Sequence, residues 1–413
     1  MDMQTTPRGG DLLDGAQRFG RTPGVLARLT APGFAKIIER IDRALVTGAI
    51  HARLPDGTST TVGGRAPGFE CQVDLKSWNA LVRLATNGSV GWYQAWEVGE
   101  WWSPDPVPLF ALFMQHATRL GDTARAKGLF RHALRLAHLF NRNTPGGAQR
   151  NIAAHYDLGN DFYAAWLDPT MSYSSGYGMV DGASLEDGQR RKWARLSERL
   201  GAPATLLEIG CGWGSLADHF ARNGSAVTAI SLSREQLAYA RQHHAAAIDF
   251  RYQDYRDVEG QYNAIVSVEM VEALGREYWP AFMDCVARNL RPGGRAALQF
   301  ITMRDDLFDD YARSADFIQA YVFPGGLLIS TPEFRRLAEA RGLTWRDEES
   351  FGHDYAATLE TWRASFDAAV DSGRLPAGFD ARFVDLWRYY LMYCEGGFRG
   401  GGIDVRQVTL VKE

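Results

Sequence analysis

The sequence contains few cysteines, no strong excess of one charge and no long apolar run. The nearest two of its four cysteines, Cys211 and Cys285, are 74 positions apart, which argues against zinc knuckles, short redox motifs and disulfide scaffolds. Lys and Arg total 45 against 49 Asp and Glu, which argues against a surface that is basic throughout and against nucleic acid as a partner. The longest largely apolar stretch, residues 106–114, covers about half a membrane span. We therefore expect a cytoplasmic protein without a transmembrane segment or a metal site.

The length and composition favour two domains. A chain of 413 residues with 46% apolar and 12% aromatic residues can build more than one core. Residues 1–20 are polar and glycine-rich without periodicity and are predicted to form a mobile arm. Helical spacing of apolar residues, short strand-like runs and a tryptophan-rich stretch predict a small α+β domain over residues 21–145. The break at Thr144-Pro-Gly-Gly separates it from a second domain over residues 146–413.

A basic segment lies near this boundary. Seven basic residues and one acid occur between Arg119 and Arg150. Within it, Lys127, Arg131 and Arg135 follow one another at intervals of four, so a helix here would carry a basic stripe beside an apolar one. Two interpretations are open: contact with an anionic membrane surface, or a linker helix whose basic side chains cover the adjoining domain.

Strands and helices alternate from about residue 185. Ser184 and Asp187 form the pattern of a capping box at the start of one helix. Apolar runs predict buried strands at residues 205–209, 226–230, 264–268 and 295–301. This alternation predicts an α/β domain with an open parallel sheet, whose ligand crevice lies at the carboxyl ends of the strands.

The most informative turn is the glycine loop that follows the first of these strands, LLEIGCGWGS at 206–215. Gly210, Gly212 and Gly214 allow the backbone to come close to a ligand where a Cβ atom would collide. Ser215 stands where a dinucleotide fingerprint needs glycine, and the Gly-Lys-Ser/Thr of a P-loop is absent. Glu208 followed by Gly-x-Gly-x-Gly is typical of an S-adenosylmethionine site. The alternative is a glycine turn without a ligand.

Further motifs follow in a fixed order along the chain. They are HYDLGNDFY at 155–163, EIGCGWG at 208–214, SLSREQ at 231–236, SVEMVEALG at 267–275, YVFPGG at 321–326, HDYAATLETW at 353–362 and YCEGGFRGG at 393–401. With this set the chain resembles the cyclopropane-fatty-acyl-phospholipid synthases, the family that also contains the mycolic acid cyclopropane synthases and methyltransferases. The segment GEWWSPD at 99–105 is similar to that family's N-terminal domain.

The resemblance implies a fold, a cofactor and a reaction. The fold is a Rossmann-like class I S-adenosylmethionine methyltransferase domain with a smaller N-terminal α+β domain that presents lipid. The reaction transfers a methyl group to a cis double bond of an unsaturated phospholipid acyl chain. The cofactor positions that match the family are Tyr173, Ser174, Gly210, Gly212, Ser231, Leu232, Gln236 and Asp254. The candidate cofactor site also includes Glu208, Gly214, Gln253 and Tyr255.

The resemblance also implies a base that removes a proton after methyl transfer. In the cyclopropane synthases this base is a bound bicarbonate, and its positions correspond to Ser175, Glu272, Gln299, Ile301 and Tyr321. Ser175 and Gln299 replace a Cys and a His, but both can donate hydrogen bonds, so bicarbonate stays a candidate. Tyr321 can stabilise a carbocation by a cation–π contact. Loss of the proton from the added methyl group gives a cyclopropane, and loss from a neighbouring carbon gives a methyl-branched or methylene chain.

Several alternatives stay open at this point. His155 is either a catalytic residue or a buried hydrogen-bonding histidine, and Glu272 can instead cap a helix. The chain can be a non-catalytic lipid-binding relative, or a methyltransferase for a small molecule. The near-neutral charge argues against RNA. A phospholipid substrate favours peripheral association with an anionic membrane surface, and a homodimer is left open.

Overall fold

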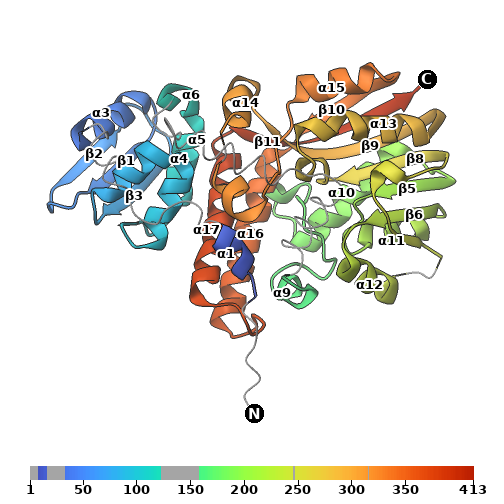
Figure 1. Cartoon of the computed structure of the whole chain (residues 1–413), viewed down its shortest axis with the longest axis horizontal. Coiled ribbons are helices and arrows are strands. Elements are labelled where there is room, and N and C mark those ends of the chain that lie inside the picture. The colour runs from blue at the N-terminus through green and yellow to red at the C-terminus, as the bar shows by residue number, and fades with distance from the viewer. Residues whose placement is uncertain (1–7, 16–32, 122–157, 245–246, 315) are drawn as a thin grey trace, which may run out of the picture. The chain divides into compact units, whose positions relative to one another are not determined.

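The computed structural model describes residues 8–15, 33–121, 158–244, 247–314 and 316–413, which form two compact units (Figure 1). The first unit comprises the described residues of Met1–Asn141, Asp306–Pro324 and Ala377–Ile403, and the second comprises those of Arg142–Asp305, Gly325–Pro376 and Asp404–Glu413. The predicted domain over residues 146–413 differs from this division, because two of its segments belong to the first unit. Within the described ranges, no helix is both long enough and apolar enough to cross a bilayer.

The first unit contains a four-stranded sheet. Its strands are β1 (Ala49–Arg53), β2 (Ser59–Gly63), β3 (Glu70–Leu75) and β4 (Trp101–Trp102). They follow the order β2-β1-β3-β4; β1 is antiparallel to β2 and parallel to β3, and β3 is antiparallel to β4. The turn at Pro55-Asp56-Gly57 joins β1 to β2, and Gly57 takes the positive φ of +85° that this turn requires.

The helices of the first unit come from three separate segments of the chain. They are α1 (Gly10–Gly15), α3 (Phe34–Ala44), α4 (Asn79–Glu97), α5 (Val107–Gln115), α6 (Ala117–Leu120), α14 (Asp305–Ala312), the π-helix η7 (Ile318–Val322) and α17 (Ala381–Arg399). Helix α3 buries Ile37, Ile41 and Ala44 on one face, as their spacing predicts. The prediction of a mobile arm over residues 1–20 is wrong for α1, because its Leu12 and Leu13 are buried.

Aromatic side chains from distant segments form the core of the first unit. The ring of Tyr93 in α4 lies 4.5 Å from that of Tyr321 in η7 and 5.0 Å from that of Tyr389 in α17. Trp92 stacks on Trp101 at 4.4 Å, and both are buried. Trp92 and Trp101, both in the tryptophan-rich stretch, therefore pack a core.

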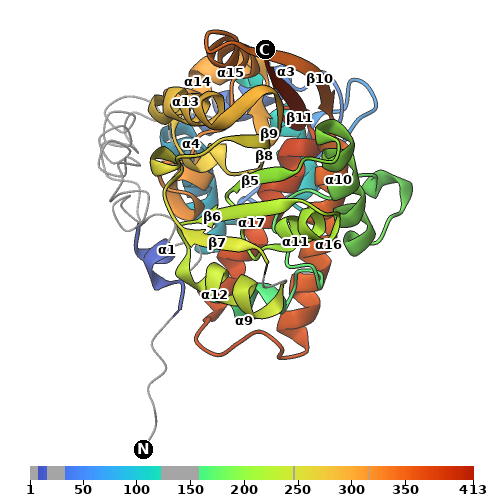
Figure 2. The same cartoon turned by 90° about the vertical axis from the view of Figure 1, so that its right-hand side faces the viewer.

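The second unit is built around a seven-stranded sheet (Figure 2). Its strands are β5 (Thr205–Ile209), β6 (Ala226–Ser231), β7 (Asp249–Tyr252), β8 (Tyr262–Val268), β9 (Leu290–Met303), β10 (Leu343–Ser350) and β11 (Ile403–Lys412). The order is β10-β11-β9-β8-β5-β6-β7; β5 to β9 are parallel, and β10 is antiparallel to β11. The four predicted strands are confirmed. The order of the strands reverses at β5, because β6 and β7 follow on one side of it and β8 and β9 on the other, and open α/β sheets bind ligands at such a point.

The remaining helices belong to the second unit. They are α9 (Asn160–Ala164), η3 (Met179–Asp181), α10 (Leu185–Leu200), α11 (Ser215–Arg222), α12 (Arg234–His243), η4 (Tyr255–Asp257), η5 (Val271–Ala273), η6 (Arg276–Tyr278), α13 (Trp279–Asn289), α15 (Thr331–Glu339) and α16 (Gly352–Asp371). Ser184 is the N-cap of α10, since its Oγ accepts a hydrogen bond of 3.1 Å from the Asp187 N–H. The Asp187 carboxylate accepts from the Ser184 hydroxyl, so the N-cap half of the predicted capping box is observed.

Apolar side chains cover both faces of the large sheet. Helices α10, α11 and α12 contribute Leu196, Phe220 and Leu237 to one core with β5, β6 and β8. Helices α13 and α15 lie on the opposite face (Figures 1 and 2), where Phe334 packs 5.2 Å from Phe300 of β9. The strands are therefore buried on both sides, which explains why they read as continuous apolar runs in the sequence.

Candidate active site

The glycine loop follows β5 and borders a cavity of about 170 Å³. Gly210, Gly212 and Gly214 have φ values of +85°, +54° and +92°, which residues with side chains rarely adopt. A Cβ atom at Gly210 would lie 2.7 Å from Met270 Cγ, closer than nonbonded carbon atoms approach. The loop can therefore keep this path beside the cavity only with glycine at these positions.

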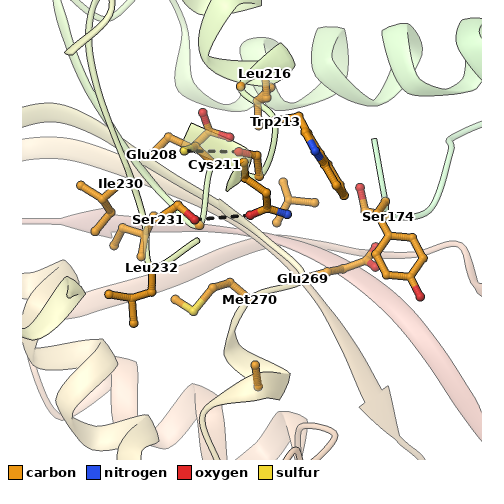
Figure 3. Close-up of a pocket in the computed structure, with 18 of the residues that line it drawn as sticks. Ser174, Glu208, Cys211, Trp213, Leu216, Ile230, Ser231, Leu232, Glu269 and Met270 are labelled. Atoms are coloured by element: carbon orange, nitrogen blue, oxygen red, sulfur yellow. Dashed lines mark hydrogen bonds between the residues drawn. The ribbon is translucent and has the colours of Figure 1, made fainter. Parts of the chain in front are cut away.

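All the residues predicted to bind the cofactor line this cavity. They are Tyr173, Ser174, Glu208, Gly210, Gly212, Gly214, Ser231, Leu232, Gln236, Gln253, Asp254 and Tyr255. Figure 3 shows Ser231 and Leu232, at the end of β6, on one side of the cavity and Ser174 on the other. The fold thus brings the candidate cofactor residues together, and their role in binding stays a prediction.

Hydrogen bonds hold the glycine loop in place. The backbone N–H groups of Gly210 and Cys211 both donate to the carbonyl of Ile230, at 3.0 Å each. Trp213 Nε1 donates to Asn160 Oδ1 of α9 at 2.7 Å. These contacts form within the protein alone, so the loop does not need to be ordered by a ligand.

Two buried ionisable groups line the cavity. Glu208 is 3% exposed, burial raises its pKa to about 8, and its Oε2 atom has no hydrogen-bond partner among the described residues. Lys192 of α10 is 1% exposed, and its Nζ donates to Ser174 Oγ at 2.5 Å. Burial lowers the pKa of Lys192 to about 8, although the charges of Glu269 and Asp168 oppose this shift. The cavity thus offers a free carboxyl oxygen and a buried ammonium group.

These groups fit S-adenosylmethionine. The cofactor carries an ammonium group, a sulfonium and a carboxylate, and it has no phosphate. The unpaired oxygen of Glu208 suits a positively charged group. Lys192 together with Ser174 suits a carboxylate. The glycine loop leaves room for the backbone to approach the rest of the molecule.

Asp254 reaches the cavity as half of an ion pair rather than as a free acceptor. Its carboxylate accepts hydrogen bonds from Arg256 Nε at 2.8 Å and Nη2 at 2.6 Å. Burial acts to raise the pKa of Asp254, but the hydrogen bonds and charge of Arg256 outweigh it and lower the pKa overall. Beside Gln253 the cavity is therefore lined by the Asp254–Arg256 ion pair and not by a carboxylate alone.

A second carboxylate, Glu269, connects two of the candidate catalytic residues. Its Oε1 atom accepts hydrogen bonds from the backbone N–H of Ser175 at 3.0 Å and from Gln299 Nε2 at 2.7 Å. Its Oε2 atom accepts one from the Tyr355 hydroxyl at 2.6 Å. Burial raises the pKa of Glu269, while the charge of Lys192 and these three hydrogen bonds oppose the shift.

Glu272 and Ile301 lie beside this group. One carboxyl oxygen of Glu272 accepts a hydrogen bond from the backbone N–H of Ile301, and the other has no partner among the described residues. Burial, followed by the charge of Glu269, raises the pKa of Glu272 to about 8. The alternative role as a helix cap is not observed, because this side chain binds strand β9. At neutral pH Glu272 is therefore mostly protonated, whereas Glu269 accepts three hydrogen bonds, as an ionised carboxylate does.

The structure does not assign the other candidate residues to this group. Tyr321 belongs to the first unit, where its ring packs against Tyr93. His155 lies outside the described residues, as do Lys127, Arg131 and Arg135. The second unit therefore brings together the candidates at positions 175, 272, 299 and 301.

Sequence reasoning missed two residues of this site. Glu269 directly follows β8, and an acid at the carboxyl end of a parallel strand was an available signal. The family resemblance indicated Glu272, three positions later, and not Glu269. Lys192 gives no such signal, because it is one of several basic residues on α10 and only the fold shows that it is buried beside the cavity.

Comparisons with known proteins agree with this site. A family model described as mycolic acid cyclopropane synthetase matches residues 144–408. The chain is 35% identical to the tuberculostearic acid methyltransferase of Mycobacterium tuberculosis, covering 94% of this chain and 93% of that protein. It is 32% identical to the cyclopropane-fatty-acyl-phospholipid synthase of Escherichia coli, covering 84% and 89%. A crystal structure of a mycolic acid cyclopropane synthase complexed with SAH and CTAB has a TM-score of 0.59 at 30% identity, covering 64% and 98%.

The parallel sheet, the glycine loop at its switch point and these neighbours define an S-adenosylmethionine-dependent methyltransferase, so the chain is an enzyme and S-adenosylmethionine is its cofactor. The chain belongs to the mycolic acid cyclopropane synthetase family. The resemblance drawn from the motifs and the predicted fold class are thereby confirmed.

The buried carboxyl groups predict how stability depends on pH. Glu208 and Glu272 have pKa values near 8 in the folded protein, against about 4.3 in an unfolded chain. Between about pH 6.5 and 8 the folded state therefore holds protons that the unfolded state has released, and the free energy of unfolding falls as the pH rises. Above about pH 8 the lowered pKa of Lys192 acts in the opposite direction. Urea denaturation at pH 6.5 and 8 measures the effect.

A double variant tests whether these two residues cause the decrease. Glu208→Gln with Glu272→Gln is expected to show a smaller fall in unfolding free energy over the same pH interval. The exposed Glu259→Gln is the matched control and is expected to behave like the wild type. An unchanged slope in the double variant would contradict the assignment.

Proposed function

We propose that this methyltransferase acts on the double bond of an unsaturated acyl chain in a membrane phospholipid. The observation that carries the proposal is similarity over nearly the whole chain to proteins named for fatty acyl products, including a cyclopropane-fatty-acyl-phospholipid synthase. This similarity extends beyond the catalytic unit into the N-terminal part of the chain. A shared catalytic unit alone would support methyl transfer without indicating a fatty acyl substrate.

The residues of the second unit have distinct tasks in this proposal. When bound, S-adenosylmethionine supplies an electrophilic methyl group. An alkene is a weak nucleophile, so the site must align it and exclude water. The glycine loop and Glu208 would hold the cofactor, and Lys192 would orient Ser174 toward it. A carboxylate at the end of β8 would accept the proton that must leave after methyl transfer.

A second candidate product lacks the ring. The Cys and His of the cyclopropane synthases are replaced by Ser175 and Gln299, which changes the groups around the departing proton. A relative named tuberculostearic acid methyltransferase is among the similar proteins. Both observations favour C-methylation that ends in a methylene or methyl-branched chain. A non-catalytic lipid-binding role is not retained, since the family and the solved neighbours are enzymes.

One incubation tests the substrate and identifies the product. Enzyme, labelled S-adenosylmethionine and vesicles of dioleoylphosphatidylglycerol are combined, and the fatty acids are identified by mass spectrometry. We expect one labelled carbon per modified chain, as a cyclopropane or as a methylene-bearing chain. Vesicles with fully saturated chains are the control and are expected to stay unlabelled. Label in a soluble acceptor but not in lipid would contradict the proposal.

We also propose peripheral association of a cytoplasmic protein with anionic membranes. The support is the basic stripe of Lys127, Arg131 and Arg135, together with the need to reach a bilayer substrate. Flotation with anionic vesicles is expected to recover more protein than flotation with neutral vesicles. Charge reversal at the three positions is expected to remove the difference. Equal recovery with both kinds of vesicle would contradict this.

A further inference from the structure

The hydrogen-bond donors expected to hold a bicarbonate are already in use. The backbone N–H of Ser175 and Nε2 of Gln299 both donate to Oε1 of Glu269, at 3.0 and 2.7 Å. The Ser175 hydroxyl donates to the carbonyl of Gly176 at 2.7 Å and offers no proton to an anion. Tyr355 completes the set by donating to the other oxygen of Glu269. A carboxylate of the chain therefore receives the donors that the family resemblance assigned to an external anion.

The orientation of Gln299 is fixed by a chain of buried amides. Arg199 Nε donates to Gln407 Oε1 at 3.1 Å, and Gln407 Nε2 donates to Gln299 Oε1 at 2.9 Å. A guanidinium can only donate, so it determines which end of each amide is the acceptor. Gln299 consequently presents its Nε2 group to Glu269. Gln299 and Gln407 are 1% and 0% exposed, so no solvent competes for these bonds.

Bicarbonate does not fit this arrangement. Its donors are occupied by Glu269, and it would add a second negative charge directly beside the half-buried Glu269 carboxylate. Repulsion is already evident within the protein, because the charge of Glu269 contributes to the raised pKa of Glu272. The site is therefore complete without an external anion.

Glu269 also has access to the reacting space. It directly follows β8 and lines the same cavity as the glycine loop (Figure 3). Its φ of +50° is uncommon for a residue with a side chain, and such residues cluster at functional sites. Its backbone N–H donates to the carbonyl of Gln299 at 2.8 Å, which fixes this conformation.

We propose that Glu269 is the catalytic base of this enzyme and replaces the bicarbonate of its relatives, an inference that rests on the proposed transfer to an acyl-chain double bond. The π electron pair of the double bond forms the new bond to the methyl carbon. The S–CH₃ bond breaks, and its electron pair stays on the sulfur atom. The other olefinic carbon is left positive. The Glu269 carboxylate then takes one proton. If the proton comes from the added methyl group, the C–H pair closes a three-membered ring; if it comes from an adjacent carbon, the pair forms a new double bond.

Activity with and without bicarbonate tests the proposal. In carbonate-depleted buffer with dioleoylphosphatidylglycerol vesicles, the wild type is expected to keep its kcat within about 2-fold of that in added bicarbonate. Glu269→Gln keeps the shape of the side chain and is expected to lower kcat about 100-fold or more. Its affinity for S-adenosylmethionine, measured by calorimetry, is expected to stay within about 3-fold of the wild type, which shows that the unit is folded. Glu259→Gln, at an exposed position, is the matched control.

Glu269→Gly provides an independent measurement. Glycine suits the φ of +50° and frees the donors of Ser175 and Gln299. We expect sodium bicarbonate to bind this variant saturably in a calorimetric titration and not to bind the wild type, and to raise the variant's kcat about 10-fold or more. Wild-type activity that requires bicarbonate, or full activity of Glu269→Gln, would overturn the proposal. The bicarbonate titration needs no lipid, so it is independent of the proposed substrate. If bicarbonate binds Glu269→Gly and not the wild type, but neither protein modifies phospholipid, the position of the Glu269 carboxylate is supported and the phospholipid substrate is refuted.

Discussion

Replacing Gly210 with valine is expected to lower the affinity for S-adenosylmethionine about 100-fold or more. Gly210 has a φ of +85°, and a Cβ atom there would lie 2.7 Å from Cγ and 3.0 Å from Cβ of Met270. These atoms are close to the Met270 backbone and cannot move aside freely. The loop must therefore shift, and Met270 lines the cavity that the cofactor would enter. Calorimetric titration with S-adenosylmethionine measures the change in affinity.

A second glycine separates the effect on binding from the effect of backbone strain. Gly224, in the turn between α11 and β6, has a φ of +93°, but a Cβ atom there meets nothing within 4 Å. Gly224→Val carries the same kind of strain without a collision and is expected to bind the cofactor within about 2-fold of the wild type. Equal affinities of Gly210→Val and the wild type would show that the glycine loop does not hold the cofactor.

Arg199→Met is expected to lower the free energy of unfolding by about 3–5 kcal/mol. The Arg199 side chain is 4% exposed and donates to Glu349 Oε2 at 2.8 Å, to the carbonyl of Asp347 at 2.5 Å and to Gln407. Methionine fills a similar volume but removes the donor to the Asp347 carbonyl and to Gln407, and it leaves Glu349 with Arg195 alone of the two arginines. Urea denaturation followed by circular dichroism measures the loss.

Arg195 offers a control that uses the same acceptor. Arg195 Nη2 also lies 2.8 Å from Glu349 Oε2, but its side chain is 39% exposed. Because water screens an exposed pair, Arg195→Met is expected to cost less than about 1 kcal/mol. Equal losses from the two variants would contradict the view that burial of Arg199 makes its contacts important.

The parts of the fold that depend on local patterns could be predicted from the sequence. The strand Thr205–Ile209 was predicted with the bounds that the structure has, because its apolar run and the glycines after it are local signals. The cofactor residues around Gly210 could also be predicted, because the carboxyl ends of parallel strands meet at one edge of a sheet.

The parts that depend on contacts between distant segments could not be predicted. Nothing near Tyr389 in the sequence indicates that α17 packs with α4 rather than with the methyltransferase sheet. Lys192 is buried only because α10 turns that side chain toward Ser174, which is 18 positions earlier. Glu269 acquires its role through Ser175 and Gln299, which come from two other segments. Each of these facts requires the tertiary structure.

The last segment of the chain also sets the order in which the protein can fold during synthesis. The first unit needs Tyr389 of α17 against Tyr93, and the second needs β11, which lies between β10 and β9 in its sheet. Domains usually fold from the N-terminus as they leave the ribosome. Here neither core can close until nearly the whole chain has emerged. A product of premature termination would therefore expose apolar surface in both units at once, and it would be a ready substrate for proteases and chaperones.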